Sequence, residues 1–329
     1  MDQKNYKFTL KITIAIGLLF LLSLISISYG ESRIGLVPSL QALFGIGEKS
    51  AITIVQNIRL PRVTAAILAG STLGLSGLYT RVALKNPLAD SSILGIQSGA
   101  SVMALISLLV FPAMASFLPL FAFIGGLLAF IIVIGFSYQN GFSPMRLVLS
   151  GVAVNSFFTA VTSVITINHI NEIKNSVQWT SGSLVGISNS QSQAMLIYSV
   201  IAIGIAALLI PMLELLKLED NMLISLGKNP NLYRFIASVT AVMLASISLA
   251  FVGVIAFAGI IVPHVSQMLV GSKMKHVFPM TVVGGGILVV GVDLFSRIVF
   301  VNEIPVGALI GVLGAPLFLY LLRGAKHGV

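Results

Sequence analysis

Apolar stretches of about 20 residues recur along the whole chain, and this pattern excludes a water-soluble fold. A helix needs about 20 mostly apolar residues to cross a bilayer, and that length gives ten candidate spans. The third and eighth candidates are short, so we expect them to be tilted or partly re-entrant. The spans cover residues 9–29, 60–80, 93–111, 117–137, 146–167, 193–215, 233–251, 254–270, 277–299 and 304–322.

The composition supports the same class. Hydrophobic residues make up 57% of the 329 residues and charged residues only 9%, against roughly 25% charged in soluble domains. Cysteine is absent, which excludes a disulfide framework and thiolate chemistry. No long linker divides the chain. We therefore predict an all-α integral membrane protein, with one polytopic transmembrane domain over residues 1–329 and an uncleaved first span.

Basic residues indicate the orientation of the spans. The net charge of +9 could suggest nucleic acid, but in a membrane protein it reflects basic cytoplasmic loops, and we predict no nucleic-acid partner. With both termini cytoplasmic, inside segments hold most of the 19 basic residues: Lys4, Lys7, Lys11, Arg81, Lys85, Arg146, Lys217, Lys228, Arg234, Lys273, Lys275, Arg323 and Lys326. Arg59, Arg62 and Arg297 fall outside, against this bias, and require an explanation.

The second span carries small residues at helical spacing. Ala66, Gly70 and Gly74 are four residues apart, a pattern that lets another helix approach closely in a bilayer. The loop before this span is about 30 residues long, and residues 38–44 are expected to form a short interfacial helix there. We expect a second surface helix within residues 168–192, with Trp179 at headgroup depth.

The sequence contains no recognisable catalytic set. It lacks the G-x-x-x-x-G-K-S/T loop that cradles nucleotide phosphates, as well as H-E-x-x-H and G-x-S-x-G. His264 follows a proline and has no carboxylate or second histidine at helical spacing, so a structural hydrogen bond explains it better than metal binding. Asp293 and Arg297 are four apart and can pair on one helix face. This pair either holds its span in place or leaves Arg297 facing a partner.

One inside segment, residues 218–230, is predicted to be a short helix between two long spans. It begins with polar residues, ends at Gly227, and Pro230 prevents the helix from resuming. Such a helix is suited to docking a partner, although a simple connecting turn would also fit the pattern.

Taken together, these motifs resemble the ABC-importer permeases for iron–siderophore complexes, haem and cobalamin. Each motif alone is weak, but their number and order are specific, and the resemblance runs nearly end to end. The motifs are Ile58-Arg59-Leu60-Pro61-Arg62, Asn86-Pro87-Leu88-Ala89-Asp90, Leu94-Gly95, Trp179 with Gly182-Ser183-Leu184, Leu226-Gly227, Gly259 with Val262-Pro263-His264, Asp293 with Arg297, Pro305-Val306-Gly307 and Gly314-Ala315-Pro316.

The resemblance implies a cobalamin-importer-permease-like fold of ten membrane helices that pairs with a second permease copy or a homologous chain. It also implies two ATPase subunits beneath and a substrate-binding lipoprotein or periplasmic protein outside, in a bacterial plasma membrane. The chain itself would hold no cofactor, because ATP binds to the partner. Arg59, Arg62 and Arg297 would meet acidic residues of the binding protein. The ATPase contact would comprise Glu219, Asp220, Asn221, Met222, Leu223, Leu226 and Gly227.

The chain departs from the family pattern at several positions. The family usually has Gln where this chain has Arg81, and Arg where it has Gln267. Such departures suit a subunit that pairs with a different permease chain. The resulting hypothesis is a non-enzymatic permease of an ABC importer for iron complexes, foremost ferric siderophores. The alternative is an ion-coupled secondary transporter of a small solute, for which Asp293 is the one acidic candidate at membrane depth.

Overall fold

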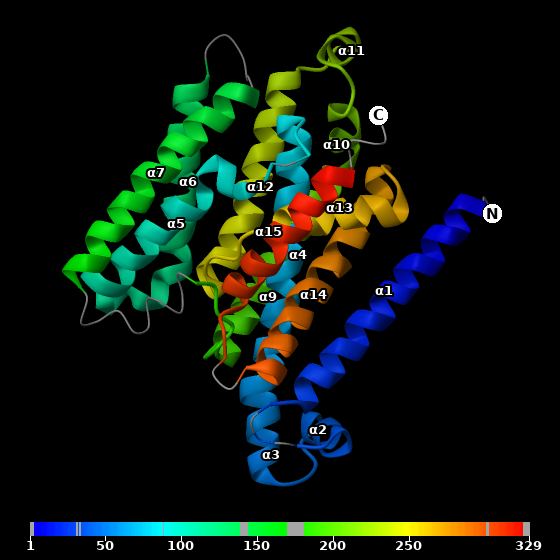
Figure 1. The fold of residues 1–329 in the computed structure, drawn as a ribbon, viewed down its shortest axis with the longest axis vertical. Helices are drawn as coiled ribbons and strands as arrows, with labels where there is room; N and C mark the ends of the chain where they lie inside the picture. The colour runs from blue at the N-terminus through cyan, green and yellow to red at the C-terminus, as the bar shows by residue number, and fades with distance from the viewer. Residues whose placement is uncertain are drawn as a thin grey trace.

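The computed structural model describes residues 3–30, 32, 34–87, 89–138, 144–169, 181–300 and 303–324, which form a bundle of helices (Figure 1). In chain order the elements are α1 (Gln3–Ser28), α2 (Leu36–Leu43), α3 (Lys49–Ile54), η1 (Val55–Arg59), α4 (Leu60–Leu84), η2 (Ser91–Leu94), α5 (Ile96–Leu105), η3 (Ile106–Val110), η4 (Pro112–Phe117), α6 (Leu118–Ser137), α7 (Pro144–Asn168), α9 (Asn189–Leu208), α10 (Ile210–Leu216), α11 (Asp220–Ser225), α12 (Pro230–Val252), α13 (Ala258–Val270), α14 (Met274–Val299) and α15 (Val306–Gly324).

Each of the ten predicted spans corresponds to an apolar helix in the structure. Seven described helices are long and apolar enough to cross a membrane, and three more apolar helices, within α5–η3, α13 and α15, are shorter. The third and eighth predicted spans are indeed short. The eighth begins only after an unwound segment in which Gly253 and Phe257 both have positive φ. The prediction of an all-helical, multi-pass membrane fold is therefore confirmed.

Helix α4 runs through the centre of the bundle and is almost completely enclosed by its neighbours (Figure 1). Its small residues allow direct backbone contact. A Cβ atom on Gly70 would lie 2.0 Å from the carbonyl oxygen of Gly285 in α14, and one on Gly77 would lie 1.8 Å from that of Gly259 in α13. Gly74 lies between them, against Val262 and Thr281. The small-residue face predicted from the sequence therefore forms the central packing surface.

The second span begins earlier than the sequence suggested. We expected it to start at residue 60, but helical structure is continuous from Lys49 to Leu84, through the π-helical segment η1. In this segment the backbone N–H of Leu60 bonds the carbonyl of Val55, five residues back. The wider turn accommodates Pro61, which has no N–H to donate. The boundary was wrong because the search for about 20 apolar residues left out the more polar residues 49–59, which continue the helix on its N-terminal side.

The two predicted surface helices have different outcomes. Residues 38–44 were expected to be helical, and the structure has α2 at Leu36–Leu43, with Leu36, Val37 and Phe44 exposed. The helix expected within residues 168–192, together with Trp179, lies largely outside the described residues.

A second layer of helices flanks this core. Helices α5 and α6 meet at another glycine pair, where a Cβ on Gly99 would lie 2.4 Å from the carbonyl oxygen of Gly125. Helix α7 lies at the edge of the chain beside α5 and α6 (Figure 1), and only 11% of its apolar window is buried. The rest of the chain therefore leaves most of the surface of α7 uncovered, as it does for α1, whose apolar window is also 11% buried.

The packing of α4 leads to a first prediction. Gly70→Val should destabilise the protein by about 1–3 kcal/mol or more, because the added carbons overlap the backbone of α14. Thermal unfolding of the purified chain in detergent measures the effect. Gly204→Val is the matched control, since nothing lies within 4 Å of a Cβ there. Equal melting temperatures for the two variants would contradict the close approach.

Candidate functional site

A cluster of ionic groups lies where the start of α4 meets the end of α14. Arg62 Nη2 lies 2.8 Å from Asp293 Oδ1 and 2.8 Å from Glu303 Oε2. The other oxygen of Asp293 lies 2.8 Å from Arg297 Nη2. The Asp293 side chain is only 1% exposed, so both arginines neutralise a carboxylate that water hardly reaches. The predicted pairing of Asp293 with Arg297 is confirmed, and Arg62 and Glu303 extend it.

Arg297 and a third arginine, Arg59, also hold the end of α1. Arg59 donates to the carbonyl oxygens of Ile27 and Ser28, at 2.8 and 2.9 Å, and also to Ser32. Arg297 donates to the carbonyl oxygens of Ser26 and Tyr29, at 3.0 and 2.9 Å. The last carbonyl groups of a helix have no partner within it and carry partial negative charge, so guanidinium groups suit this place. Arginines thus fasten α1 to α4 and α14.

The three arginines predicted to dock a binding protein are therefore brought together at one end of the bundle. Arg62 and Arg297 pair with two carboxylates, whereas Arg59 bonds oxygen atoms at the end of α1, so the cluster carries a net charge of +1. Their contacts within the chain give all three arginines a structural role. Docking stays a prediction. Sequence reasoning did not assign Glu303 to this cluster; the signal for it was an acidic residue two positions before Pro305, at the start of the last span.

At the opposite end, the short helix predicted within residues 218–230 is present as α11, and its contact with an ATPase stays a prediction. It is closed by two hydrogen bonds, from Gly227 N to Ile224 O at 2.9 Å and from Lys228 N to Leu223 O at 3.0 Å. Gly227 has φ 69°, the left-handed conformation that ends helices in this way. The predicted termination at Gly227 is confirmed.

The side chains of α11 divide into an inward and an outward set. Leu223 is fully buried against the core, whereas Met222 and Leu226 are 56% and 57% exposed. Ile224, which the sequence analysis did not single out, is also exposed. An exposed apolar surface on a short helix beyond the ends of the long spans is typical of a protein contact. Leu223 instead anchors the helix to its own chain.

An ionic clamp fixes α11 to two long helices. Asp220 Oδ1 accepts hydrogen bonds from Lys85 Nζ, at the end of α4, and from Arg234 Nη2, in α12, both at 2.8 Å. Burial raises the pKa of Asp220, but the hydrogen bonds and positive charges of Lys85 and Arg234 outweigh it and hold that pKa below its ordinary value. The side chain is therefore ionised at neutral pH.

Two departures from the family pattern contact each other. Arg81 Nη2 in α4 donates to Gln267 Oε1 in α13 at 3.0 Å. In the family pattern the first of these positions is usually Gln and the second is usually Arg. The exchange places the same two side-chain types in contact with their positions reversed.

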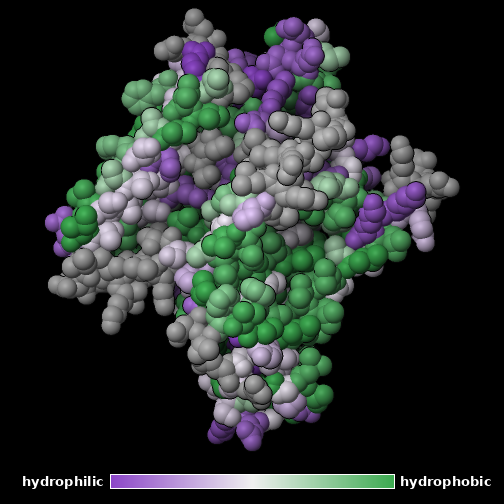
Figure 2. Space-filling model, viewed as in Figure 1, coloured by the Kyte–Doolittle hydropathy of each residue, from purple (hydrophilic) through white to green (hydrophobic). Residues whose placement is uncertain are grey.

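Helix α7 carries a polar stripe on its exposed surface. Asn155, Thr159, Thr162 and Thr166 recur at spacings of four, three and four, which places them on one side of the helix. Asn155 and Thr159 are exposed, and Figure 2 shows pale and hydrophilic atoms along this helix among the apolar green. At membrane depth a polar stripe faces protein or water rather than lipid.

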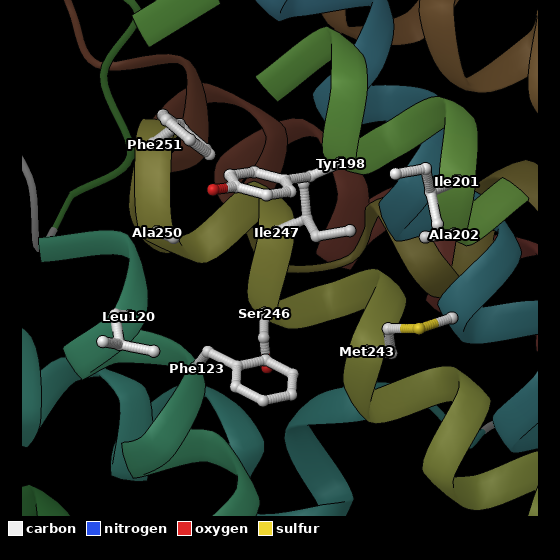
Figure 3. A pocket seen from close by; sticks show the side chains of 10 residues that line it. All are labelled: Leu120, Phe123, Tyr198, Ile201, Ala202, Met243, Ser246, Ile247, Ala250 and Phe251. Atoms are coloured by element: carbon white, nitrogen blue, oxygen red, sulfur yellow. The ribbon is translucent and has the colours of Figure 1, made fainter. Parts of the chain in front are cut away.

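The cavity in Figure 3, between α6, α9 and α12, is apolar. It measures about 320 Å³ and is lined by aliphatic and aromatic side chains, among them Phe123, Ile247 and Phe251, with hydroxyl groups from Tyr198 and Ser246 (Figure 3). Such a lining offers no charge to a metal complex. Among the described residues, no three histidine or acidic side chains are grouped so that they could hold a metal ion.

Comparison with known proteins matches this architecture to one family. The FecCD transport family matches residues 18–324. The chain belongs to the FecCD transport family. It is 34% identical over 323 residues to the Fe(3+)-citrate import system permease protein YfmE of Bacillus subtilis (strain 168), covering 98% of this chain and 97% of that protein. It is also 34% identical over 283 residues to the Probable heme-iron transport system permease protein IsdF of Staphylococcus aureus (strain Newman), covering 85% of each.

Solved structures share the fold of this FecCD member. A metal-chelate type ABC transporter in an inward-facing conformation superposes with a TM-score of 0.84 and 24% identity, over 95% of this chain and 98% of that one. PsaBC from Streptococcus pneumoniae superposes with a TM-score of 0.59 and 16% identity, over 82% of this chain and 93% of that one. At these identities the likeness establishes the fold alone.

The ionic cluster around Asp293 yields a second prediction. Asp293→Asn should destabilise the protein by about 3–5 kcal/mol, because it leaves Arg62 and Arg297 without their shared buried counter-charge. Glu303→Gln is the matched control: its carboxylate is 28% exposed, so about 1 kcal/mol or less is expected. Thermal unfolding in detergent measures the loss of stability in both variants. An equal loss in Glu303→Gln and Asp293→Asn would refute the assignment of Asp293 as the buried centre.

The clamp on α11 yields a third prediction, which depends on pH. A carboxylate with a lowered pKa stabilises the folded state above its unfolded pKa of about 3.9, and this contribution is lost as the pH falls through the folded pKa. Asp220→Asn should therefore speed amide hydrogen exchange in residues 219–228 at pH 7, with a difference from wild type that shrinks below about pH 4. Glu219→Gln, which replaces the neighbouring carboxylate, should have little effect. A pH-independent difference would contradict the clamp.

Proposed function

We propose that this chain is the permease subunit of an ABC importer that takes up an iron complex, with ferric siderophores as the foremost class. The observation that carries the proposal is the family match over residues 18–324. The curated relatives, which cover nearly the same length, are named as permeases for Fe(3+)-citrate and for haem iron. The secondary-transporter alternative loses support, because Asp293 is engaged by two arginines.

Energy for this transport comes from partner subunits. The chain has no nucleotide-binding loop of its own, so ATP is bound and hydrolysed by an ATPase. The exposed residues of α11, Met222, Ile224 and Leu226, form the contact with that ATPase. The clamp of Asp220 with Lys85 and Arg234 transmits the movement of α11 to α4 and α12.

The translocation pathway requires a second permease chain. The polar stripe of α7 lies on the exposed edge of this subunit, and a second copy or a homologous chain facing it would enclose a pathway between the two stripes (Figure 2). This arrangement explains hydroxyl and amide groups at membrane depth. The pathway lies in a bacterial plasma membrane with both chain termini in the cytoplasm, as the distribution of basic residues favours.

Reconstitution tests the proposed function and the coupling helix together. The chain, its ATPase and its substrate-binding protein in proteoliposomes should accumulate ferric citrate or a ferric siderophore only with ATP. Met222→Asp combined with Leu226→Asp should reduce uptake at least tenfold and release the ATPase during purification, because carboxylates replace its apolar contact.

Two variants serve as controls for this measurement. Phe44→Asp changes an even more exposed apolar residue at the other end of the molecule, and the ATPase should remain bound. Leu223→Asp places a carboxylate in the core, so insertion itself should fail. ATP-independent accumulation of the iron complex would overturn the importer, whereas normal coupling in the Met222→Asp/Leu226→Asp variant would overturn only the docking role of α11.

Docking of the substrate-binding protein at the Asp293 cluster can be tested with substitutions that change its net charge in opposite directions. Arg62→Gln lowers the positive charge of the cluster by one, and Glu303→Gln raises it by one. If acidic residues of the binding protein meet this cluster, the first variant should slow association and the second should speed it, each by several-fold at low salt and little at high salt. Damage to folding would slow association in both variants. Unchanged rates at low salt would remove the arginines from the docking site.

A further inference from the structure

Two cavities meet beside the N-terminal half of α1. This helix packs against α14 through its second half, where Leu19 and Leu22 contact Gly286 and Gly291, and it leans away from the bundle towards its N-terminus (Figure 1). In the space between α1, α13 and α14 lies a groove of about 410 Å³. Its walls are almost entirely apolar, with Ile14, Leu18, Val265, Met280, Ile287 and Leu288 among the lining residues.

A basic pocket of about 340 Å³ lies at the end of this groove. Lys7 and Lys11 from α1 line it, together with Lys273 and His276 from the start of α14. Lys11 and Leu269 line both the pocket and the groove, so the two spaces are adjacent. The ring of Phe8 stacks on His276 at 4.2 Å between ring centres and gives the pocket an apolar wall.

The charges in this pocket are available to a ligand. Lys11 Nζ donates to the carbonyl oxygen of Leu269 at 2.5 Å, which fixes its ammonium group at the boundary between pocket and groove. Lys7 and Lys273 are exposed and form no ion pair within the described part of the chain. The acidic group near Lys273 is Glu214, which is already engaged by Lys217 Nζ and by the backbone N–H of Met274. The pocket therefore attracts an anion.

We propose that the pocket and groove together form a binding site for an anionic phospholipid. The phosphate lies among Lys7, Lys11 and Lys273, and one acyl chain follows the groove between α1 and α14. Basic pockets between membrane helices on the cytoplasmic side are suited to such headgroups. The groove lies along a helix that is long and apolar enough to span the membrane, so the apolar molecules that reach it are lipids. Figure 2 shows this sequence of hydrophilic and then apolar surface along α1.

The occupied site would fill the gap that α1 leaves on the bundle. Near its C-terminal end α1 is fastened by Arg59 and Arg297, whereas near its N-terminal end it contacts α13 through the hydrogen bond of Lys11 to Leu269. A lipid bridging Lys7 and Lys273 would connect α1 to the start of α14. It would thereby stabilise the turn between α13 and α14, which begins at Gly271.

Lipid retention by the full chain tests the headgroup half of the site. The chain is purified in detergent, incubated with phosphatidylglycerol or phosphatidylcholine, and the bound lipid is counted by native mass spectrometry. Phosphatidylglycerol should be retained and phosphatidylcholine lost. Each lysine near a lipid headgroup contributes about fivefold in affinity. Lys7→Gln combined with Lys273→Gln should therefore weaken the binding of phosphatidylglycerol roughly 25-fold. Lys228→Gln with Lys275→Gln removes the same charge outside the pocket and should leave it unchanged.

A second pair of variants tests the acyl half. A Cβ on Gly284 would make ordinary contacts at 3.6 Å with Ser266 and Val262, so Gly284→Leu can fold and fill the groove. Gly17→Leu, where nothing lies within 4 Å, is its control. Gly284→Leu should lose phosphatidylglycerol while Gly17→Leu keeps it. Equal retention of both lipids, or equal loss in both lysine pairs, would overturn the site. If inorganic phosphate displaced phosphatidylglycerol and Gly284→Leu had no effect on its retention, the pocket would be a site for small anions. That result would overturn the proposed lipid site.

Discussion

The backbone contact of α4 with α14 and α13 is the constraint on which the rest of this structure depends. Between helices in a bilayer no hydrophobic driving force is available, so close van der Waals packing must hold the bundle. Gly70 against Gly285 and Gly77 against Gly259 let three helices approach without side chains between them. This packing fixes the axis of α4, and the axis in turn fixes where its two charged ends lie.

Those charged ends connect α4 to both faces of the molecule. Arg62 joins the buried Asp293 at one end, and Lys85 joins Asp220 of α11 at the other. Helix α4 has 25 residues, which corresponds to a length of about 37 Å, close to the thickness of a membrane. One rigid helix thus spans the distance between the ionic cluster around Asp293 and the proposed ATPase contact. Helix α4 therefore keeps the Asp293 cluster and α11 at a fixed distance from each other.

The sequence predicted what depends on local pattern. Span positions followed from the length of the apolar stretches, the Asp293–Arg297 pair from its spacing of four, and the end of α11 from Gly227. Contacts between distant residues could not be predicted in this way. Arg62 and Asp293 are 231 residues apart, and their pairing depends on how α4 and α14 pack. The inward position of Leu223 was also hidden, because a helix of six residues shows too little periodicity to identify its buried side.

A distance measurement tests the rigidity of α4 most directly. The chain contains no cysteine, so spin labels can be placed at Ser50→Cys in α3 and Ser225→Cys in α11, both exposed positions. Electron–electron double resonance on the complex with its ATPase then compares the nucleotide-free and ATP-bound states. The account predicts one narrow distance distribution that stays the same in both states, because α3, α4 and α11 move as one body. A distribution that shifts on ATP binding would contradict it.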